Sequence, residues 1–536
     1  MVPANDPPDG SARPVALESA QAPDLDAASP PPPDSCLAVS DESGSPGAFR
    51  APVLRGLLWQ FLGRGTLQVS QILVVVLLAR LLTPSEYGIA GMVLVVISFE
   101  PLLAGNGLAA ALIQRPVITE LDKSTVFWTN AAIGLLACLI GVAVSPLVAD
   151  FYGNAEVGPL FAAVSVVFLV SSLSSVQANL LIRDMNFRSL ELRTMAATVV
   201  GAAAAIALAA GGAGAWALIA QQLAVYTVSL MLLTGFTHWR PRLMFSRASL
   251  RELRSFGGNA SGTILMNQLT YNTDNVLIGR VLGASALGLY TFGYSLIMLP
   301  VTRIASPLVQ VLYPVFARIQ HDRPRLSSLW LRSLRMMAAV TLPSMLGLIV
   351  VAPEAIDIVF GRRWHNATPV VQILATVGIA IAIQNLNGIV LQAQGKTRLV
   401  FRYSCVLFAG GLIAFIVGLQ WGIVGVAACF AAVNVVVQPA YLHLTARSME
   451  ISLGQCGRAL SGVVQATVVA IAAALITRGL LVADGAPATL RLVATIAAAT
   501  ALYGFALIWR APDVVSELRD LRPRRSTPAP AEIVAA

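Results

Sequence analysis

Long apolar runs, almost free of charge, recur along this chain and limit its fold more than any other feature. A helix needs roughly twenty mostly apolar residues to cross a bilayer. Hydrophobic residues make up 56% of the 536, whereas charged residues make up only 12%. Since soluble domains stop growing beyond about 250–300 residues, one water-soluble core could not bury this surface. The sequence therefore predicts an all-α, polytopic membrane protein.

Hydropathy divides the apolar part into about fourteen transmembrane helices. The two least marked divisions are at 211–214 and 420–421, but each of those runs is long enough that it must cross twice. The expected spans are 57–82, 88–113, 125–148, 158–182, 194–212, 214–236, 258–279, 287–314, 332–352, 367–393, 401–419, 421–444, 459–482 and 490–509.

Segments rich in polar residues precede and follow the spans. Residues 1–50 are acidic and rich in Pro, Ala and Ser, which predicts a disordered tail. This tail lacks a basic region followed by an apolar one, so it is not a signal peptide. Residues 511–536 form a second tail.

The positions of Lys and Arg predict the orientation, because cationic loops are retained in the cytoplasm. Most of the 36 Lys and Arg residues fall in alternate connections, which places both termini in the cytoplasm of a bacterial inner membrane. The connections assigned to the outside hold only Arg80, Arg280, Arg362, Arg363, Arg478 and Arg491.

The net charge of +9 does not indicate nucleic-acid binding, because the Arg residues stand singly between apolar runs. The five Cys residues have no metal-ligand spacing, so we expect no metal site and no bound cofactor.

An internal repeat is visible at an offset of 200 residues. VLLARLLTPSEYG at 76–88 matches VLIGRVLGASALG at 276–288, with Arg80, Ser85 and Gly88 recurring as Arg280, Ser285 and Gly288. Farther on, DFYG at 150–153 matches IVFG at 358–361. The repeat predicts two six-helix lobes of the same orientation, at residues 55–240 and 255–446, with the substrate between them. Two additional helices at 457–510 lie outside the repeat.

Four motifs resemble the polysaccharide-biosynthesis flippases of the multidrug/oligosaccharidyl-lipid/polysaccharide exporter superfamily. They are TDNVLIGRVLGASALGLY at 273–290, WRPRLMFS at 239–246, FYGNAEV at 151–157 and LLIRDMNFRSLE at 180–191. The resemblance implies a two-lobed transporter that moves polyprenyl-diphosphate-linked oligosaccharide outward by alternating access. It also implies surface polysaccharide synthesis (O-antigen, capsule or exopolysaccharide), with membrane lipids around the protein and a polymerase and export proteins as partners.

Other functions are compatible with the same architecture. A drug exporter or a peptidoglycan-precursor flippase of the same superfamily would share the fold. A membrane polymerase or glycosyltransferase would instead need a sizeable outer loop with catalytic groups. No expected outer loop exceeds about fifteen residues, so the sequence favours a transporter over an enzyme.

Charges inside apolar spans are costly, roughly 2.5–3.5 kcal/mol each, so they indicate a wet cavity or a partner. Four residues qualify: Arg64, Glu100, Asp274 and Arg303. Glu100 and Arg303 occupy matching depths in the two lobes and could form an ion pair across the cavity, either for function or for structure alone. Arg64 is the candidate for the substrate diphosphate, because guanidinium offers paired donors at any pH.

The span at 258–279 is unusually polar. Gln268, Asn272 and Asn275 share one helical face, which predicts a strip that binds sugar hydroxyls or, alternatively, polar contacts between helices. Asp274 could couple transport to a proton, whereas sodium binding or a structural pairing remains open. Arg80 and Arg280, at the outer ends of equivalent helices, could receive the diphosphate after flipping or serve only as membrane anchors.

Overall fold

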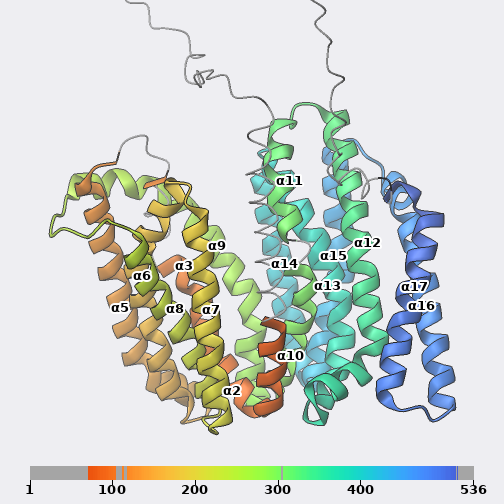
Figure 1. The fold of residues 1–536 in the computed structure, drawn as a ribbon. Coiled ribbons are helices and arrows are strands. Elements are labelled where there is room, and N and C mark those ends of the chain that lie inside the picture. The colour runs from red at the N-terminus through yellow and green to blue at the C-terminus, as the bar shows by residue number, and fades with distance from the viewer. Residues whose placement is uncertain (1–70, 104–111, 114–117, 303–305, 515, 517–536) are drawn as a thin grey trace, which may run out of the picture. The chain divides into compact units, whose positions relative to one another are not determined.

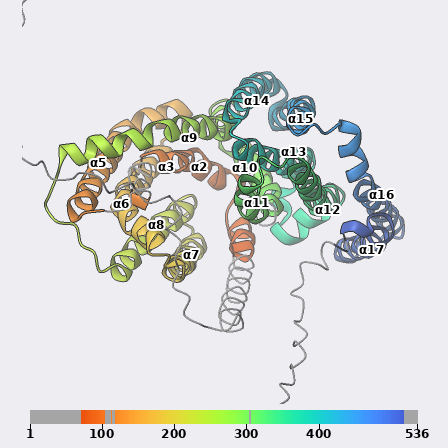
Figure 2. The same ribbon diagram turned by 90° about the horizontal axis from the view of Figure 1, so that it is seen from above.

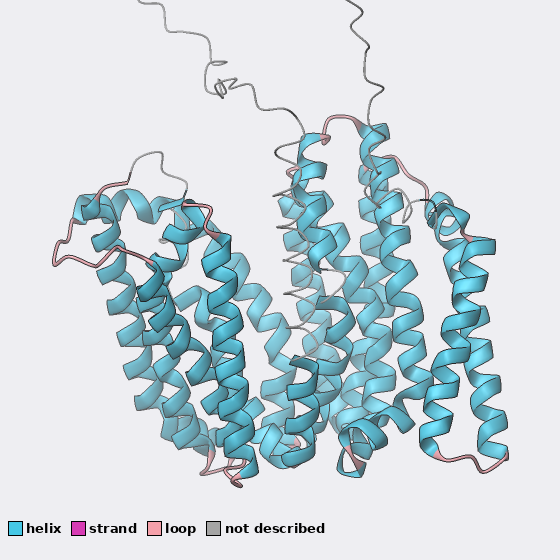
Figure 3. Ribbon diagram, in the orientation of Figure 1, coloured by secondary structure: helices cyan, strands magenta, loops and turns pink. Residues whose placement is uncertain are grey.

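The computed structural model describes residues 71–103, 112–113, 118–302, 306–514 and 516, and every regular element in those residues is helical (Figures 1 and 3). Residues 71–81 form the first described helix. The others are α2 Pro84–Leu94, η2 Val95–Phe99, α3 Glu100–Leu103, α5 Glu120–Tyr152, α6 Val157–Arg183, α7 Phe187–Ala210, α8 Trp216–Phe236, α9 Arg247–Val281, α10 Gly283–Pro300, α11 Ser306–Arg318, α12 Arg323–Ala355, η4 Ile356–Phe360, η5 Arg362–Ala367, α13 Thr368–Ala393, α14 Thr397–Gly418, η6 Leu419–Trp421, α15 Gly422–Ser448, α16 Leu453–Ala483 and α17 Ala488–Arg510.

The described helices confirm a polytopic, all-α membrane fold. Nine helical stretches in this part of the chain are long and apolar enough to cross a bilayer. They coincide with expected spans, including the two doubtful pairs, since α7 and α8 are separate helices and so are α14 and α15. The count of fourteen stays a prediction, because residues 57–70 and 104–111 lie outside the described residues.

Two expected spans change their helix type near a proline. In the span at 88–113, α2 gives way to the 3-10 helix η2 at Val95, and α3 follows with Pro101. In the span at 287–314, α10 ends at Pro300, and residues 301–302 continue as π-helix. Proline has no backbone N–H and clashes with the preceding turn, so neither segment continues as one regular α-helix.

Packing divides the described helices into two groups. In the N-lobe, α5 packs on α6, α7 packs on α8, and α6 joins the two pairs and contacts α2 and α3. In the C-lobe, α13 packs against α10, α11, α12 and α15, and α14 packs on α15. The helix between them, α9, contacts α5 of the N-lobe as well as α10 and α14 of the C-lobe (Figure 2).

The helices α16 and α17 pair with each other and pack on α12, apart from the N-lobe (Figures 1 and 2). Arg478 on α16 donates to the buried carboxylate of Glu354 at 2.9 Å, and Tyr503 on α17 donates to the Ala339 carbonyl at 2.5 Å. A buried carboxylate needs such a partner, so this contact fixes the pair on the C-lobe.

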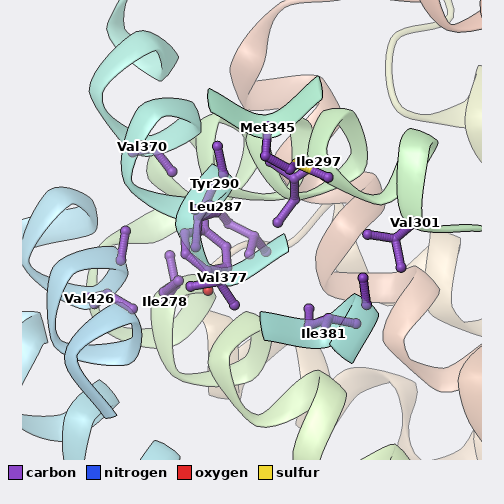
Figure 4. Packing of buried hydrophobic residues seen from close by; sticks show 14 of the residues in the cluster. Ile278, Leu287, Tyr290, Ile297, Val301, Met345, Val370, Val377, Ile381 and Val426 are labelled. Atoms are coloured by element: carbon purple, nitrogen blue, oxygen red, sulfur yellow. The ribbon is translucent and has the colours of Figure 1, made fainter. Parts of the chain in front are cut away.

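A continuous apolar core runs through both lobes, and Figure 4 shows the part of it that lies among the C-lobe helices. Leu287, Tyr290 and Ile297 of α10 lie there with Val370, Val377 and Ile381 of α13, all buried. Apolar surface could also face lipid, so close packing rather than water exclusion holds these helices together. Elsewhere the exposed apolar side chains are numerous, as expected for helices that face a bilayer.

The connection between α8 and α9 contains the WRPRLMFS motif and is fastened to the start of α5. Trp239 donates to Glu120 at 2.8 Å, and Trp128 donates to the Arg242 carbonyl at 2.8 Å. The buried Asp122 accepts a hydrogen bond from Ser249 of α9. The motif thus ties the beginning of α9 to the N-lobe.

Candidate functional site

The helices α2 and α10 lie side by side where the two lobes meet (Figures 1 and 2). Their crossing brings together the repeat-related residues Gly88 and Gly288. A Cβ on Gly88 would overlap the Ala284 carbonyl oxygen, and a Cβ on Gly288 would overlap the Pro84 carbonyl oxygen. Only glycine permits this backbone approach. We call the end of the lobes that carries this crossing the outer end, following the orientation predicted from charge.

Trp364 of η5, in the C-lobe, packs at the same contact between the two lobes. Its side chain is fully buried, and its indole N–H donates to the Ala79 carbonyl at 2.6 Å. Tyr87 of α2 packs edge-on against it, with ring centroids 5.5 Å apart. The sequence reasoning missed Trp364; its one signal was a tryptophan in a short predicted loop.

Arg80 and Arg280 each extend to the opposite lobe. Arg80 donates from Nε to the Val359 carbonyl at 2.8 Å and from Nη2 to the Ile358 carbonyl at 2.6 Å. Arg280 lies over the Phe151 ring, 5.5 Å from its centroid. Ile358 and Val359 belong to IVFG, and Phe151 belongs to DFYG, so equivalent arginines contact equivalent segments of the other repeat.

Arg80 also lines an open pocket of about 480 Å³ at the outer end. Arg362 and Arg363 line it as well, together with Asp357, whose carboxylate pairs with His365 at 3.0 Å. The three arginines outnumber the one carboxylate, so the side chains that line the pocket carry a net positive charge.

The polar residues of α9 have different surroundings. Gln268 donates to the Ser98 carbonyl of the N-lobe, beside the break at Pro101. Asn272 donates to the Gln268 carbonyl at 2.8 Å, within its own helix. Gln268 therefore makes the kind of polar contact between helices that was the alternative to sugar binding. The side chain of Asn275 is half-buried and has no hydrogen-bond partner among the described residues.

Asp274 is buried between α9 and α10. Its carboxylate accepts a hydrogen bond from the Tyr290 hydroxyl at 3.0 Å and from the Asn275 backbone N–H at 2.8 Å. Both partners are neutral, so the carboxylate is held by hydrogen bonds within the C-lobe side of the structure.

Glu100 lines a cavity of about 310 Å³ inside the N-lobe. Glu100 is hydrogen-bonded to Ser171 there. Most of the other lining side chains are polar: Ser174, Ser175, Asn179, Arg193, Thr194, Thr198, Tyr226 and Ser229, beside Ala178, Ala197 and Val225. Sequence reasoning selected Glu100 but missed these partners, although the run SSLSSVQAN at 171–179 carried a signal.

Arg64 and Arg303 lie outside the described residues, so the expected diphosphate ligand and the expected Glu100–Arg303 pair stay predictions. Among the residues that are described, no group of three or more His, Cys, Asp or Glu could hold a metal ion.

The fold defines the class of protein, a polytopic all-α membrane protein. Its helices superpose on those of "Lipid II flippase MurJ, inward closed conformation" with a TM-score of 0.70 and 13% identity, over 86% of this chain and 100% of that one. They also superpose on an inward-facing multidrug resistance MATE family transporter of the MOP superfamily, with a TM-score of 0.58 and 14% identity, over 71% of this chain and 94% of that one. At such identities the likeness concerns the fold alone.

Residues 77–369 match the family described as "Polysaccharide biosynthesis protein", and the chain belongs to that family. The teichuronic acid biosynthesis protein TuaB of Bacillus subtilis (strain 168) is 29% identical, over 72% of this chain and 80% of its own. The lipopolysaccharide biosynthesis protein WzxC of Escherichia coli (strain K12) is 26% identical, over 73% and 80%. The succinoglycan biosynthesis transport protein ExoT of Rhizobium meliloti (strain 1021) is 32% identical, over 60% and 65%.

Proposed function

We propose that the protein is a flippase that carries polyprenyl-diphosphate-linked oligosaccharide from the cytoplasmic to the outer leaflet of a bacterial inner membrane, for surface polysaccharide synthesis. The observation that carries the proposal is the contact of the two lobes at the outer end, where repeat-related glycines cross and Trp364 is buried. Such a contact closes the exit side and leaves loading to the cytoplasmic side. Family membership and relatives named for surface polysaccharides support the substrate class.

Transport then follows from exchange between two arrangements of the lobes. Residues 55–240 and 255–446 move as the two lobes, with both termini in the cytoplasm. The substrate enters while the α2–α10 contact is closed, and it leaves when this contact opens outward.

The arginines at the outer end supply a release step. While the outer end is closed, Arg80 is bonded to the carbonyls of 358 and 359, and Arg280 lies on Phe151. Outward opening frees both guanidinium groups, which can then bind the arriving diphosphate through paired donors. Arg64 is the proposed first ligand of the diphosphate on the cytoplasmic side.

The polymer itself is made by other proteins, so a polysaccharide polymerase and export proteins are the expected partners of this flippase. Lipid-linked oligosaccharide must reach the outer leaflet before they can use it. Coupling to a proton or a sodium ion through Asp274 is an additional proposal.

Complementation tests the function. The gene should restore surface polymer in a strain that lacks its own polysaccharide flippase, and a variant with Gly88→Trp, in which the outer end cannot close, should not. Restored growth of a strain depleted of its lipid II flippase, without restored polymer, would instead support the peptidoglycan-precursor alternative and refute the proposal.

Orientation is tested separately by cysteine labelling of intact cells. In a cysteine-free background, Asn366→Cys should react with an impermeant maleimide, whereas Leu243→Cys should react only after lysis, because both positions are exposed at opposite ends of the helices. The reverse pattern would invert the proposed topology.

A further inference from the structure

The polar cavity at Glu100 in the N-lobe has no part in the outer contact or in the proposed binding of the diphosphate. It lies between α3, α6, α7 and α8, all of the N-lobe, and among the side chains that the structure describes no C-lobe residue lines it. The cavity can therefore keep its shape while the two lobes move against each other. A site of this kind can hold a substrate group throughout transport.

Ser174, Ser175 and Asn179 follow one another along α6 and line this cavity; we call them the α6 ladder. Ser174 donates its hydroxyl to the Ser171 carbonyl at 2.8 Å, and Ser175 donates to the Ser172 carbonyl at 2.9 Å. Asn179 donates to the Ser175 carbonyl at 2.8 Å. Ser175 Oγ already accepts a hydrogen bond from Asn130 Nδ2 at 2.9 Å. Since the hydroxyl of Ser174 and the amide of Asn179 donate to the backbone, their oxygens, with the second lone pair of Ser175 Oγ, can accept hydrogen bonds from a ligand.

Two charged side chains from different helices, Glu100 of α3 and Arg193 of α7, also line the cavity. The Glu100 carboxylate accepts hydrogen bonds, and Arg193 of α7 has a buried Nε–H with no partner in the described structure. A buried donor without a partner is costly, so a ligand oxygen at this position would be favourable. The two charges balance, which favours a neutral ligand over an anionic one.

Size restricts the ligand further. The cavity holds about 310 Å³, the volume of roughly ten liquid waters and the lower end of the range of about 300–1,000 Å³ for small-molecule sites. This suits one pyranose ring but not an oligosaccharide. Tyr226 adds an aromatic ring to the lining, on which the apolar face of a sugar can pack.

We infer that this N-lobe cavity is a subsite for one neutral sugar residue of the lipid-linked oligosaccharide, and that Arg193, Glu100 and the α6 serines select it. This inference rests on the proposed function. The sugar hydroxyls donate to the α6 ladder and to Glu100, while a ring or hydroxyl oxygen accepts from Arg193. Specificity for a particular polymer would then reside in one lobe.

Direct binding of monosaccharides tests the subsite without any transport. The full protein is placed in nanodiscs, because alkyl maltoside detergents would themselves occupy a sugar site. Saturation-transfer NMR is then recorded with glucose, galactose, N-acetylglucosamine and, as the anionic comparison, glucuronate. At least one neutral sugar should give a signal at least threefold stronger than glucuronate does.

Ala178→Phe supplies the decisive variant, because Ala178 lines the cavity and a phenyl ring would fill it. Ala203→Phe is its matched control, since Ala203 is exposed on α7 and lies outside the cavity. The sugar signal should be lost in the first variant and kept in the second, with both proteins eluting as the wild type does on gel filtration. Arg193→Ala, which leaves the cavity open, should weaken the signal at least fivefold.

The outcomes separate this inference from the proposed function. If the wild-type gene restores polymer and Ala178→Phe does so equally well with an unchanged sugar signal, the subsite is refuted and the flippase function stands. If neutral sugars bind and are displaced by Ala178→Phe but the wild-type gene never restores polymer, the subsite stands and the transported molecule has been misassigned. Equal signals from glucuronate and the neutral sugars would refute the charge argument and with it the neutral ligand.

Discussion

The interiors of the two lobes differ at matching positions. Arg193 in α7 and Tyr403 in α14 both lie six residues after the start of their helices, at Phe187 and Thr397. Arg193 lines the polar cavity of the N-lobe, whereas Tyr403 stacks on Tyr441 with ring centroids 3.6 Å apart. Gln438 also packs in this cluster and donates a hydrogen bond of 2.8 Å to the Tyr403 hydroxyl. The same helical framework thus encloses a cavity in one lobe and a packed cluster in the other.

Where the lobes touch, by contrast, the two repeats are alike. Gly88 and Gly288 occupy the same position in their repeats and cross each other, and Arg80 and Arg280 reach equivalent segments. The comparison indicates that the glycine crossing at the outer contact requires both repeats equally, whereas recognition of the substrate is divided unequally between them.

The largest expected effect comes from the shared feature. Gly88→Ala and Gly288→Ala should each reduce polymer export more than a hundredfold, because the added Cβ overlaps a backbone carbonyl and closure at the outer end would cost about 3 kcal/mol or more. Complementation of the flippase-deficient strain measures this. Gly235→Ala is the control, since a Cβ there meets nothing within 4 Å. Strongly unequal effects of the two substitutions would contradict the symmetry of the contact.

The next prediction concerns the filled cluster and the open cavity. Tyr403→Ala should lower the free energy of unfolding by about 3 kcal/mol, because it removes a buried ring and leaves a void. Arg193→Ala should leave stability nearly unchanged, since the Arg193 Nε–H has no partner among the described residues and its Nη2 donates only a long hydrogen bond, 3.3 Å, to the adjacent Thr194. Thermal unfolding followed by intrinsic fluorescence compares them. A larger loss of Tm for Arg193→Ala would mean that the N-lobe cavity is structural.

These differences show what the sequence could and could not predict. Hydropathy predicted the described membrane helices, because they depend on local composition, but α9 and α12 begin at Arg247 and Arg323, well before the expected starts at 258 and 332. The repeat predicted the equivalence of Gly88 with Gly288. The partners of Glu100 could not be predicted, because serine and threonine in membrane helices commonly bond to their own backbone, as Ser165 and Thr129 do here. Trp364 was missed because its contact with Ala79 joins segments far apart in the chain.

A smaller effect, on the rate of flipping, is expected from Asp274, a carboxylate that has no counterpart in the other repeat. Asp274 corresponds to Val74, and both side chains are buried. If Asp274 carries a proton inward, one pH unit of gradient supplies about 1.4 kcal/mol and can accelerate flipping at most tenfold. Asp274→Asn should abolish this acceleration yet keep the response to voltage, because the amide oxygen can still accept from Tyr290.

Flipping into proteoliposomes with imposed gradients provides the measurement for Asp274. Asp150→Asn is the control, because Asp150 is an exposed carboxylate near the outer end of α5. A wild-type protein that ignores the pH gradient would exclude proton coupling through Asp274. Stimulation by a sodium gradient that Asp274→Asn removes would assign the residue to sodium instead.

The smallest effects should come from the two arginines at the outer end, and their ratio sharpens the comparison of the repeats. Arg80 makes two hydrogen bonds to carbonyls, but its side chain is exposed, so their net contribution to closure is about 1 kcal/mol, or fivefold in the closed-to-open ratio. Arg280 makes a single exposed cation–π contact, which contributes about 0.5 kcal/mol, or twofold.

Spin labels at Ala155 and Asn366, on exposed outer connections of the two lobes, would report the open population as a longer distance. Arg80→Ala should increase that population more than Arg280→Ala does, and Arg80→Lys should restore little, because an ammonium cannot reproduce the two directed donors. Equal increases would mean that the contact is as symmetric in energy as it is in sequence, and that the carbonyl bonds of Arg80 contribute nothing beyond its charge.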